Sequence, residues 1–292
     1  MFKGSIVALV TPMLDDGSVD FVSLRTLIEY HIDSGTDGIV VVGTTGESVT
    51  LSFTEQQAVI GFVVDVVNKR IPVIAGNGTN NTAQAVARTQ ALNALDIDGF
   101  LTVVPYYNKP SQQGLLAHFS AIAAATDKPL LLYNVPSRTV CDLQAQTVIK
   151  LAQISNIVGI KEATGDMGRL DEIKAACPAD FILLSGDDSS MVEFIRHGGH
   201  GVISVTANVA PKAMAEVCRL ALNGFFSDAL AIDENLNLLH KRLFVAPSPA
   251  PAKWILQQFG LISCANVRLP LLCLEPIDHN AVKEAMKMAG LI

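Results

Sequence analysis

Lys161 is the residue whose type and position offer the most definite chemistry. It directly follows the apolar run 157–160, so its side chain lies in the barrel mouth if that run is a strand of a barrel. Burial disfavours the charged form of an amine, and a neutral amine can attack a carbonyl carbon to give a carbinolamine and then an imine. A structural lysine paired with Glu162 or Asp187 is the alternative that position alone leaves open.

Tyrosines stand where two other strands should end. Three of the four in the chain fall at such positions, namely Tyr106, Tyr107 and Tyr133. Imine chemistry needs a proton shuttle, and a phenol held by neighbouring hydroxyl groups can supply one. Thr44 and Thr45 can provide those hydroxyl groups. For any single tyrosine, packing at the barrel rim is an equal alternative.

Two further features can bind carboxylates at the same ends of the strands. Gly43 and Gly46 flank Thr44-Thr45 and leave backbone N–H groups free to face an anion. No Gly-Lys-Ser/Thr follows, so the segment is not a Walker phosphate loop. Arg138 can grip a second carboxylate with two hydrogen bonds, although a solvated arginine fits the spacing equally well.

The histidines indicate no metal site at this end of the barrel. Four fall in predicted helical segments and two precede the last strand, at the opposite end: His31, His118, His240, His279, His197 and His200. A metal-dependent aldolase needs imidazoles at its active face. We interpret the acidic pair Asp187-Asp188 as a helix cap before Ser189. No metal ion is therefore expected.

Eight short, nearly continuous apolar runs should supply the strands, as in parallel strands covered on both faces. They begin near Ile6, Ile39, Ile71, Phe100, Leu130, Ile157, Phe181 and Val202. Amphipathic segments lie between them, and capping signals precede three of these: Ser52 and Thr54, Asn81 and Thr82, and Ser111. The alternation predicts an α/β protein with a closed (β/α)8 TIM barrel. An open doubly wound sheet would usually show a glycine fingerprint after its first strand, where this chain has Thr11-Pro12.

The chain beyond the eighth strand is predicted to be helical to its end. A proline-rich break interrupts it at Pro247, Pro249 and Pro251. Length alone allows one large domain or two smaller ones. We interpret residues 1–224 as the catalytic barrel and residues 225–292 as a C-terminal helical extension packed on the barrel.

The composition argues against several classes of protein. Of the 292 residues, 50% are hydrophobic and 17% charged, as in a globular chain. A net charge of −7 argues against nucleic-acid binding, which needs clustered cations, but one or two placed cations suffice for an acidic small molecule. No apolar stretch is long enough for a bilayer, and the first is too short for a signal peptide, so we expect a cytoplasmic protein. The five cysteines never occur as C-x-x-C, so buried free thiols are expected.

Six segments together resemble the dihydrodipicolinate synthase family. They are 43–48 (GTTGES), 105–108 (PYYN), 133–139 (YNVPSRT), 159–163 (GIKEA), 185–188 (SGDD) and 201–204 (GVIS). The resemblance runs from Ser5 to the C-terminal helices, and the motifs are highly specific in combination. It implies a lyase in which pyruvate condenses with L-aspartate 4-semialdehyde, a step of diaminopimelate and lysine biosynthesis.

The same resemblance implies a role for each matching residue. Lys161 would form the imine and Tyr133 would be the acid and base. Thr44 and Tyr107 would complete a hydroxyl relay, with Tyr107 donated across a dimer interface. The implied substrate-binding residues are Thr45 for the pyruvate carboxylate, Arg138 for the semialdehyde carboxylate, the Ile203 carbonyl beside the imine, and Gly186. The resemblance further implies a homotetramer, a dimer of dimers, and no cofactor besides the covalent imine.

A possible inhibitory lysine pocket of the family is only partly present. Ser48, Asn80 and Tyr106 match it, whereas Phe53, Gln56 and Gln84 stand where lysine-inhibited members have two histidines and a glutamate. The lost carboxylate removes a partner for the lysine ammonium, so we expect weak or absent feedback inhibition. In addition, Val140 replaces a common glycine and can shift the loop of Arg138.

Two other functions fit parts of this pattern. N-acetylneuraminate lyase and sugar-acid aldolases share the lysine and the tyrosine. They lack the Ser137-Arg138-Thr139 segment, which favours a short carboxylated aldehyde here. A barrel that merely binds a carboxylate metabolite would hold it without any covalent adduct.

Overall fold

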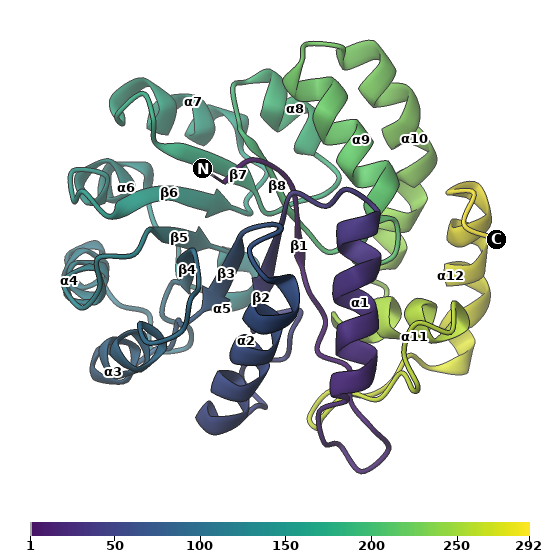
Figure 1. Cartoon of the computed structure of the whole chain (residues 1–292). Helices are drawn as coiled ribbons and strands as arrows, with labels where there is room; N and C mark the ends of the chain where they lie inside the picture. Colours follow the sequence, from purple (N-terminus) through teal and green to yellow (C-terminus); the bar gives the residue numbers. More distant parts are fainter. Residues whose placement is uncertain (1) are drawn as a thin grey trace.

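The computed structural model describes residues 2–292, whose eight parallel strands close into a barrel surrounded by helices (Figure 1). The strands are β1 (Gly4–Ala8), β2 (Gly38–Val41), β3 (Val73–Gly76), β4 (Gly99–Val103), β5 (Leu130–Asn134), β6 (Ile157–Glu162), β7 (Ile182–Ser185) and β8 (Gly201–Ser204). They pair in chain order, and β1 closes the barrel on β8, where Ile6 pairs with Ile203. The predicted TIM barrel is confirmed.

The apolar runs are continuous because both faces of each strand are buried. Leu131 of β5 points into the barrel interior, where it packs with Ile6 and Ile74. Leu130 and Leu132, on the opposite face of the same strand, belong to the larger core between the barrel and its helices. Parallel strands covered on both sides need this composition.

Helices follow the strands in the chain and cover the outside of the barrel. They are α1 (Phe21–Asp33), α2 (Phe53–Val67), α3 (Thr82–Leu92), α4 (Gln112–Ala123), α5 (Pro136–Thr139), α6 (Ala145–Leu151), α7 (Met167–Ala176), α8 (Met191–Arg196), η1 (Thr206–Asn208) and α9 (Pro211–Leu222). The N-caps of α2, α3 and α4 are Ser52, Asn81 and Ser111. Ser52 and Glu55 form a reciprocal capping box. Thr54 and Thr82 lie within their helices instead of capping them.

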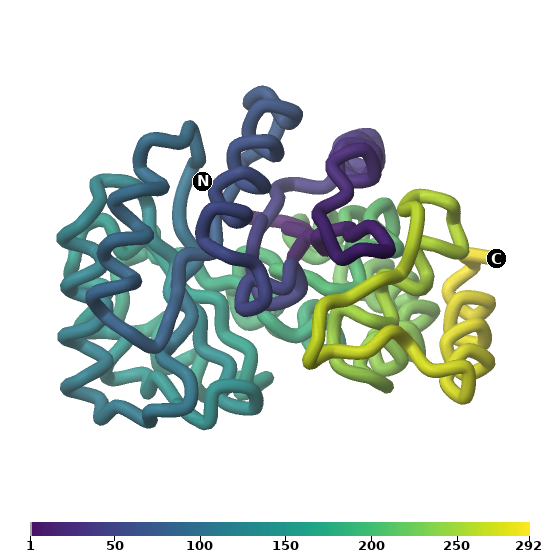
Figure 2. The backbone as a smooth tube through the Cα atoms, turned by 90° about the horizontal axis from the view of Figure 1, so that it is seen from below, coloured from purple at the N-terminus to yellow at the C-terminus, as the bar shows by residue number. Residues whose placement is uncertain are grey.

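Three further helices follow the barrel, namely α10 (Phe226–Arg242), α11 (Ala250–Gln258) and α12 (Pro276–Met288). α10 packs against α9 and α12, and Leu236, Leu239 and Val282 are fully buried there. The chain after α11 returns to the loop between β1 and α1, where the Ser263 hydroxyl donates to Asp20 over 2.7 Å. Figure 2 shows this C-terminal stretch beside the N-terminal part of the tube. We propose that residues 225–292 are a layer of the barrel domain, packed on residues 1–224.

The cysteines are free thiols, as the sequence predicts, but they differ in burial. Cys141 and Cys218 are buried, Cys177 and Cys264 are half-buried, and Cys273 is exposed, so the expectation of burial is confirmed for the first two and wrong for Cys273. No helix among residues 2–292 is both long and apolar enough to cross a bilayer.

Truncation after residue 224 should abolish cooperative folding, because it uncovers the side of α9 that α10 covers. We expect the full chain to unfold in a single thermal transition, and the 1–224 fragment to lack a transition in near-ultraviolet circular dichroism. Removal of residues 291–292, which leaves α12 intact, is the control. A 1–224 fragment that unfolds cooperatively would show that the extension is dispensable for the barrel.

Candidate active site

A cavity of about 200 Å³ opens at the carboxyl ends of the strands. Six of the residues selected from the sequence line it: Thr44, Thr45, Tyr133, Arg138, Lys161 and Gly186. They belong to β5 and β6 or to the segments that follow β2, β5 and β7. The chain brings them together only by closing the barrel, which places all of these strand ends on one rim.

Lys161 lies in this cavity with 5% of its surface exposed. The register of β5 and β6 pairs it with Tyr133, and its amine nitrogen lies 4.3 Å from the centre of the Tyr133 ring. Within residues 2–292, no ion pair joins this amine to a carboxylate. The alternative of a structural lysine paired with Glu162 or Asp187 is therefore wrong.

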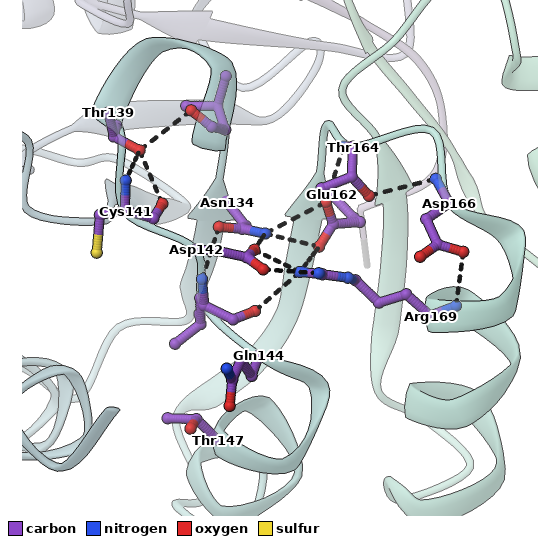
Figure 3. A network of polar contacts seen from close by, with 12 residues as sticks. Asn134, Thr139, Cys141, Asp142, Gln144, Thr147, Glu162, Thr164, Asp166 and Arg169 are labelled. Atoms are coloured by element: carbon purple, nitrogen blue, oxygen red, sulfur yellow. Dashed lines mark hydrogen bonds and ion pairs between the residues drawn. The ribbon is translucent and has the colours of Figure 1, made fainter. Parts of the chain in front are cut away.

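Glu162 adjoins Lys161 in the sequence but is held in a polar network away from the cavity (Figure 3). Its carboxylate accepts from the Asn134 side chain over 3.1 Å and from the Thr164 backbone over 2.8 Å. Arg169 of α7 lies 3.8 Å from it and pairs with both oxygens of Asp142. The network ties β5, β6 and α7 together and so fixes the strand that carries Lys161.

The pKa values of Glu162 and Asp142, the two carboxyl groups joined by Arg169, are shifted in opposite directions. Burial raises the pKa of Glu162 above its usual value, and the hydrogen bonds from Asn134 and Thr164 oppose that effect. The hydrogen bonds from Arg169 lower the pKa of Asp142. Arg169 therefore serves mainly as the partner of Asp142.

The turn of Thr44 and Thr45 has a constrained backbone. Val42 and Glu47 both have left-handed φ values, 55° and 58°, which residues other than glycine seldom adopt. Position 76 of β3, which packs against this turn, requires glycine. A Cβ on Gly76 would lie 2.1 Å from the Val42 carbonyl oxygen. The turn thus packs directly on β3 with little freedom to move.

Arg138 reaches the cavity from α5, a short helix that starts at Pro136. The sequence suggested a loop here, but the hydroxyl of Thr139 bonds the carbonyls of Val135 and Cys141 and stabilises a helical turn. Val140 ends the helix with a left-handed φ of 54°. Because this conformation favours glycine, Val140 is strained at that position, yet Arg138 keeps its place at the cavity.

Gly186 is needed for the position of Lys161. A Cβ at this residue would lie 3.0 Å from the Lys161 Cε atom and 2.6 Å from the Ala163 Cβ atom. Any side chain here would push into the stem of the lysine. Gly186 therefore contributes by leaving room for the side chain of Lys161.

Two residues assigned by resemblance do not line the cavity. Tyr107 is 87% exposed and has a left-handed φ of 76°. Ile203 lies in β8 and is buried in the barrel interior. The structure of the single chain brings neither of them into contact with the space beside Lys161.

A smaller cavity of about 30 Å³ adjoins the first through Thr44 and Tyr133, and Ser48, Gln56 and Arg88 line it. The Gln56 amide donates to the carbonyls of Ser48 and Leu51 and is thereby occupied. The guanidinium of Arg88 lies 5.6 Å from the centre of the Phe53 ring. Of the other pocket residues, Asn80 donates to the Tyr106 carbonyl over 3.1 Å, and Gln84 is exposed.

The sequence interpretation of Asp187-Asp188 as a helix cap is wrong. The N-cap of α8 is Ser190, and no side chain caps that end of the helix. Asp187 accepts from the backbone and hydroxyl of Ser190. Asp188 accepts from the backbone of Val205 and Thr206 and so ties the ends of β7 and β8. Among residues 2–292, no cluster of three or more potential ligand side chains is placed to hold a metal.

Sequence reasoning missed several residues that shape the site. Phe244 and Val205 line the cavity, and Glu47 is buried behind the turn of Thr44. Phe244 belongs to the C-terminal extension and has no sequence signal, since only the packing of α10 places it there. Glu47 was visible in the 43–48 motif, but the motif alone indicates no partner for it.

A buried lysine beside a tyrosine, at the carboxyl ends of the strands of a (β/α)8 barrel, defines the class of Schiff-base aldolases. The model of the dihydrodipicolinate synthetase family matches residues 1–289. The chain belongs to this family.

Individual relatives agree over the whole length. The 4-hydroxy-tetrahydrodipicolinate synthase of Escherichia coli K12 is 53% identical over 292 residues, which cover 100% of both chains. A solved structure of the chloride-inhibited dihydrodipicolinate synthase of Acinetobacter baumannii, complexed with pyruvate, is 48% identical, with a TM-score of 0.97 and complete coverage of both chains. The dihydrodipicolinate synthase of Aquifex aeolicus is 45% identical, with a TM-score of 0.96 and 99% of each chain covered.

Replacing Gly186 by alanine should displace Lys161 and lower kcat/KM by at least about tenfold, since a misplaced reacting group is costly even at small displacements. Steady-state kinetics with both substrates would measure the loss. Gly61→Ala is the matched control, because a Cβ there meets nothing closer than 3.9 Å. Unchanged activity of a folded Gly186→Ala variant would show that Lys161 does not need this space.

Proposed function

We propose that this cavity condenses pyruvate with L-aspartate 4-semialdehyde through an imine on Lys161. The chain is a lyase of the dihydrodipicolinate synthetase family, and its function is that of 4-hydroxy-tetrahydrodipicolinate synthase, in diaminopimelate and lysine biosynthesis. The observation that carries the mechanism is a lysine amine buried in the cavity, 4.3 Å from the centre of a tyrosine ring and without a carboxylate partner among the described residues.

In the proposed sequence, the Lys161 amine attacks C2 of pyruvate, and loss of water gives the imine. Loss of a proton from C3 gives an enamine, whose carbon attacks the aldehyde carbon of the second substrate to form the new C–C bond. The amino group of that substrate then attacks C2, closes the ring and releases Lys161. Tyr133, next to Lys161 in the paired strands, is the acid and base that transfers the protons.

The cavity lining supports the assignments of Thr44, Thr45, Arg138 and Gly186, whereas that of Ile203 rests on the family resemblance. Thr45 is 4% exposed and would bind the carboxylate of pyruvate, while Thr44 is exposed at the rim and would pass protons to Tyr133. Arg138 would hold the carboxylate of the semialdehyde with two hydrogen bonds. The Ile203 carbonyl, beside the imine in this scheme, and Gly186 complete the substrate-binding set.

Tyr107 requires a second subunit in this scheme. Its side chain is 87% exposed and outside the cavity of its own chain, so it would enter the relay of a neighbouring subunit. We propose a homotetramer, a dimer of dimers, as the assembly that delivers it. One related structure, 36% identical with a TM-score of 0.96, is described as a monomeric dihydrodipicolinate synthase variant, so fold similarity alone does not fix the assembly.

We propose that the reaction needs no cofactor, because Lys161 itself supplies the electron sink as an imine. We also propose a reducing, cytoplasmic location, in which the five free cysteines would stay as thiols.

Borohydride reduction in the presence of pyruvate tests the central step. We expect a covalent adduct on Lys161, located by peptide mass spectrometry, that is absent in Lys161→Ala. Lys150→Ala, which removes an exposed lysine of α6, should leave the adduct unchanged. A correctly folded native chain that forms no adduct would remove the mechanism.

Lysine should inhibit this enzyme weakly or not at all at micromolar concentrations. The smaller cavity presents Arg88 and no carboxylate, so a lysine ammonium would meet a cation instead of a partner. Initial rates at increasing lysine concentration measure the effect, with norleucine as a control that lacks the side-chain ammonium. Half-inhibition by micromolar lysine would contradict the expectation.

A further inference from the structure

A buried ion pair connects the C-terminal helices to the turn of Thr44 and Thr45. Lys253 of α11 and Glu47 are 206 positions apart, and both side chains are 0% exposed. The Lys253 Nζ atom lies 2.5 Å from Glu47 Oε1 and also donates to the Asn266 carbonyl over 2.7 Å. The other Glu47 oxygen accepts from the Arg268 backbone over 3.0 Å. Each charged group is thus hydrogen-bonded twice in a fully buried site.

Because Glu47 lies in this turn, its ion pair with Lys253 bears on the backbone conformation of the turn. Its φ of 58° is left-handed, a conformation that persists for such a residue only when its surroundings enforce it. The Glu47 backbone N–H donates to the Thr44 carbonyl over 3.1 Å. The neighbouring Gly46 carbonyl accepts from the Thr11 hydroxyl over 2.8 Å. A change at the Glu47 side chain would therefore pass directly to the backbone of Thr44 and Thr45.

A second contact holds the far end of the same loop. Arg268 donates to the Thr50 carbonyl over 2.8 Å and forms an ion pair with Glu55 at the start of α2. This pair lowers the pKa of Glu55 to about 2. The C-terminal chain therefore contacts the loop between β2 and α2 at two points. The contact at Glu47 is the one closer in sequence to Thr44 and Thr45, which line the cavity.

Neither member of the buried pair can act on a substrate directly. Glu47 and Lys253 do not line the cavity. Burial lowers the pKa of Lys253, while the neighbouring Glu47 carboxylate opposes that effect. A lysine that is enclosed and paired in this way has no access to a carbonyl carbon, so its effect on the reaction must be indirect.

We propose that Lys253 is a positioning residue for the condensation: by holding Glu47, it sets Thr44 and Thr45 at the wall of the cavity. The inference rests on the proposed function, in which Thr45 binds the carboxylate of pyruvate. Without Lys253, the charge of the buried Glu47 carboxylate is left uncompensated, and the left-handed turn loses one of the contacts that fix it. The C-terminal extension then takes part in substrate binding as well as in packing.

The first test is Lys253→Met, which keeps the length of the side chain and removes its charge. We expect the KM for pyruvate to rise by about tenfold, because the turn no longer presents its donors correctly. The KM for the semialdehyde should stay nearly constant, since Arg138 comes from α5 and not from this turn. Arg70→Met, which breaks the surface pair with Glu29, is the control and should change neither constant.

The double variant Glu47→Leu/Lys253→Met separates positioning from stability. Removing both charges should restore much of the thermal stability lost in Lys253→Met, while the KM for pyruvate stays raised. Recovery of that KM together with stability, or an unchanged KM in the folded single variant, would overturn the inference. If the single variant does not fold, the double variant decides. Failure of the proposed function is distinguishable, because the native chain would then form no adduct with pyruvate.

Discussion

The two-residue repeat of β6 separates the side chains of Lys161 and Glu162, which adjoin in the sequence. Successive side chains of a strand point to opposite faces, so Lys161 enters the barrel mouth while Glu162 joins the network with Asn134 and Arg169. On one face, the two would form an ion pair and hold the lysine as an ammonium that cannot attack a carbonyl. Register has the same effect in β5, where Tyr133 lines the cavity and Asn134 supports the outer network. The chemistry therefore depends on strand register before it depends on any single contact.

The chain contains two buried lysines with opposite environments. Lys161 is 5% exposed, opens on a cavity and has an aromatic face as its neighbour. Lys253 is 0% exposed, is enclosed by protein and has a carboxylate at hydrogen-bond distance. A buried ammonium is tolerated when it is paired and hydrogen-bonded, which is the situation of Lys253. Burial alone therefore does not mark a reactive amine. In the proposed mechanism, the combination of burial, an open cavity and no paired carboxylate distinguishes Lys161 from Lys253.

The sequence predicts the features that depend on local pattern and strand order. Continuous apolar runs located the strands, and the residue after such a run located Lys161, because a barrel gathers all of its strand ends on one rim. Gly186 was placed with the substrate-binding residues by resemblance, but its physical role requires a distance to Lys161 that no sequence contains. The same holds for Lys253 and Glu47, whose 206-residue separation leaves no local signal. Features that depend on a long-range contact therefore appeared only with the structure.

Charge and size together narrow the substrates of the cavity. The net charge of −7 would repel anions over a distance, yet the guanidinium of Arg138 lines the cavity. The carboxylate among the lining residues, Asp187, accepts two hydrogen bonds from Ser190 and is therefore engaged with the protein. A volume of about 200 Å³ is small for a ligand pocket and is compatible with a three-carbon keto acid. Local placement of charge can therefore favour an anionic substrate against the sign of the whole molecule.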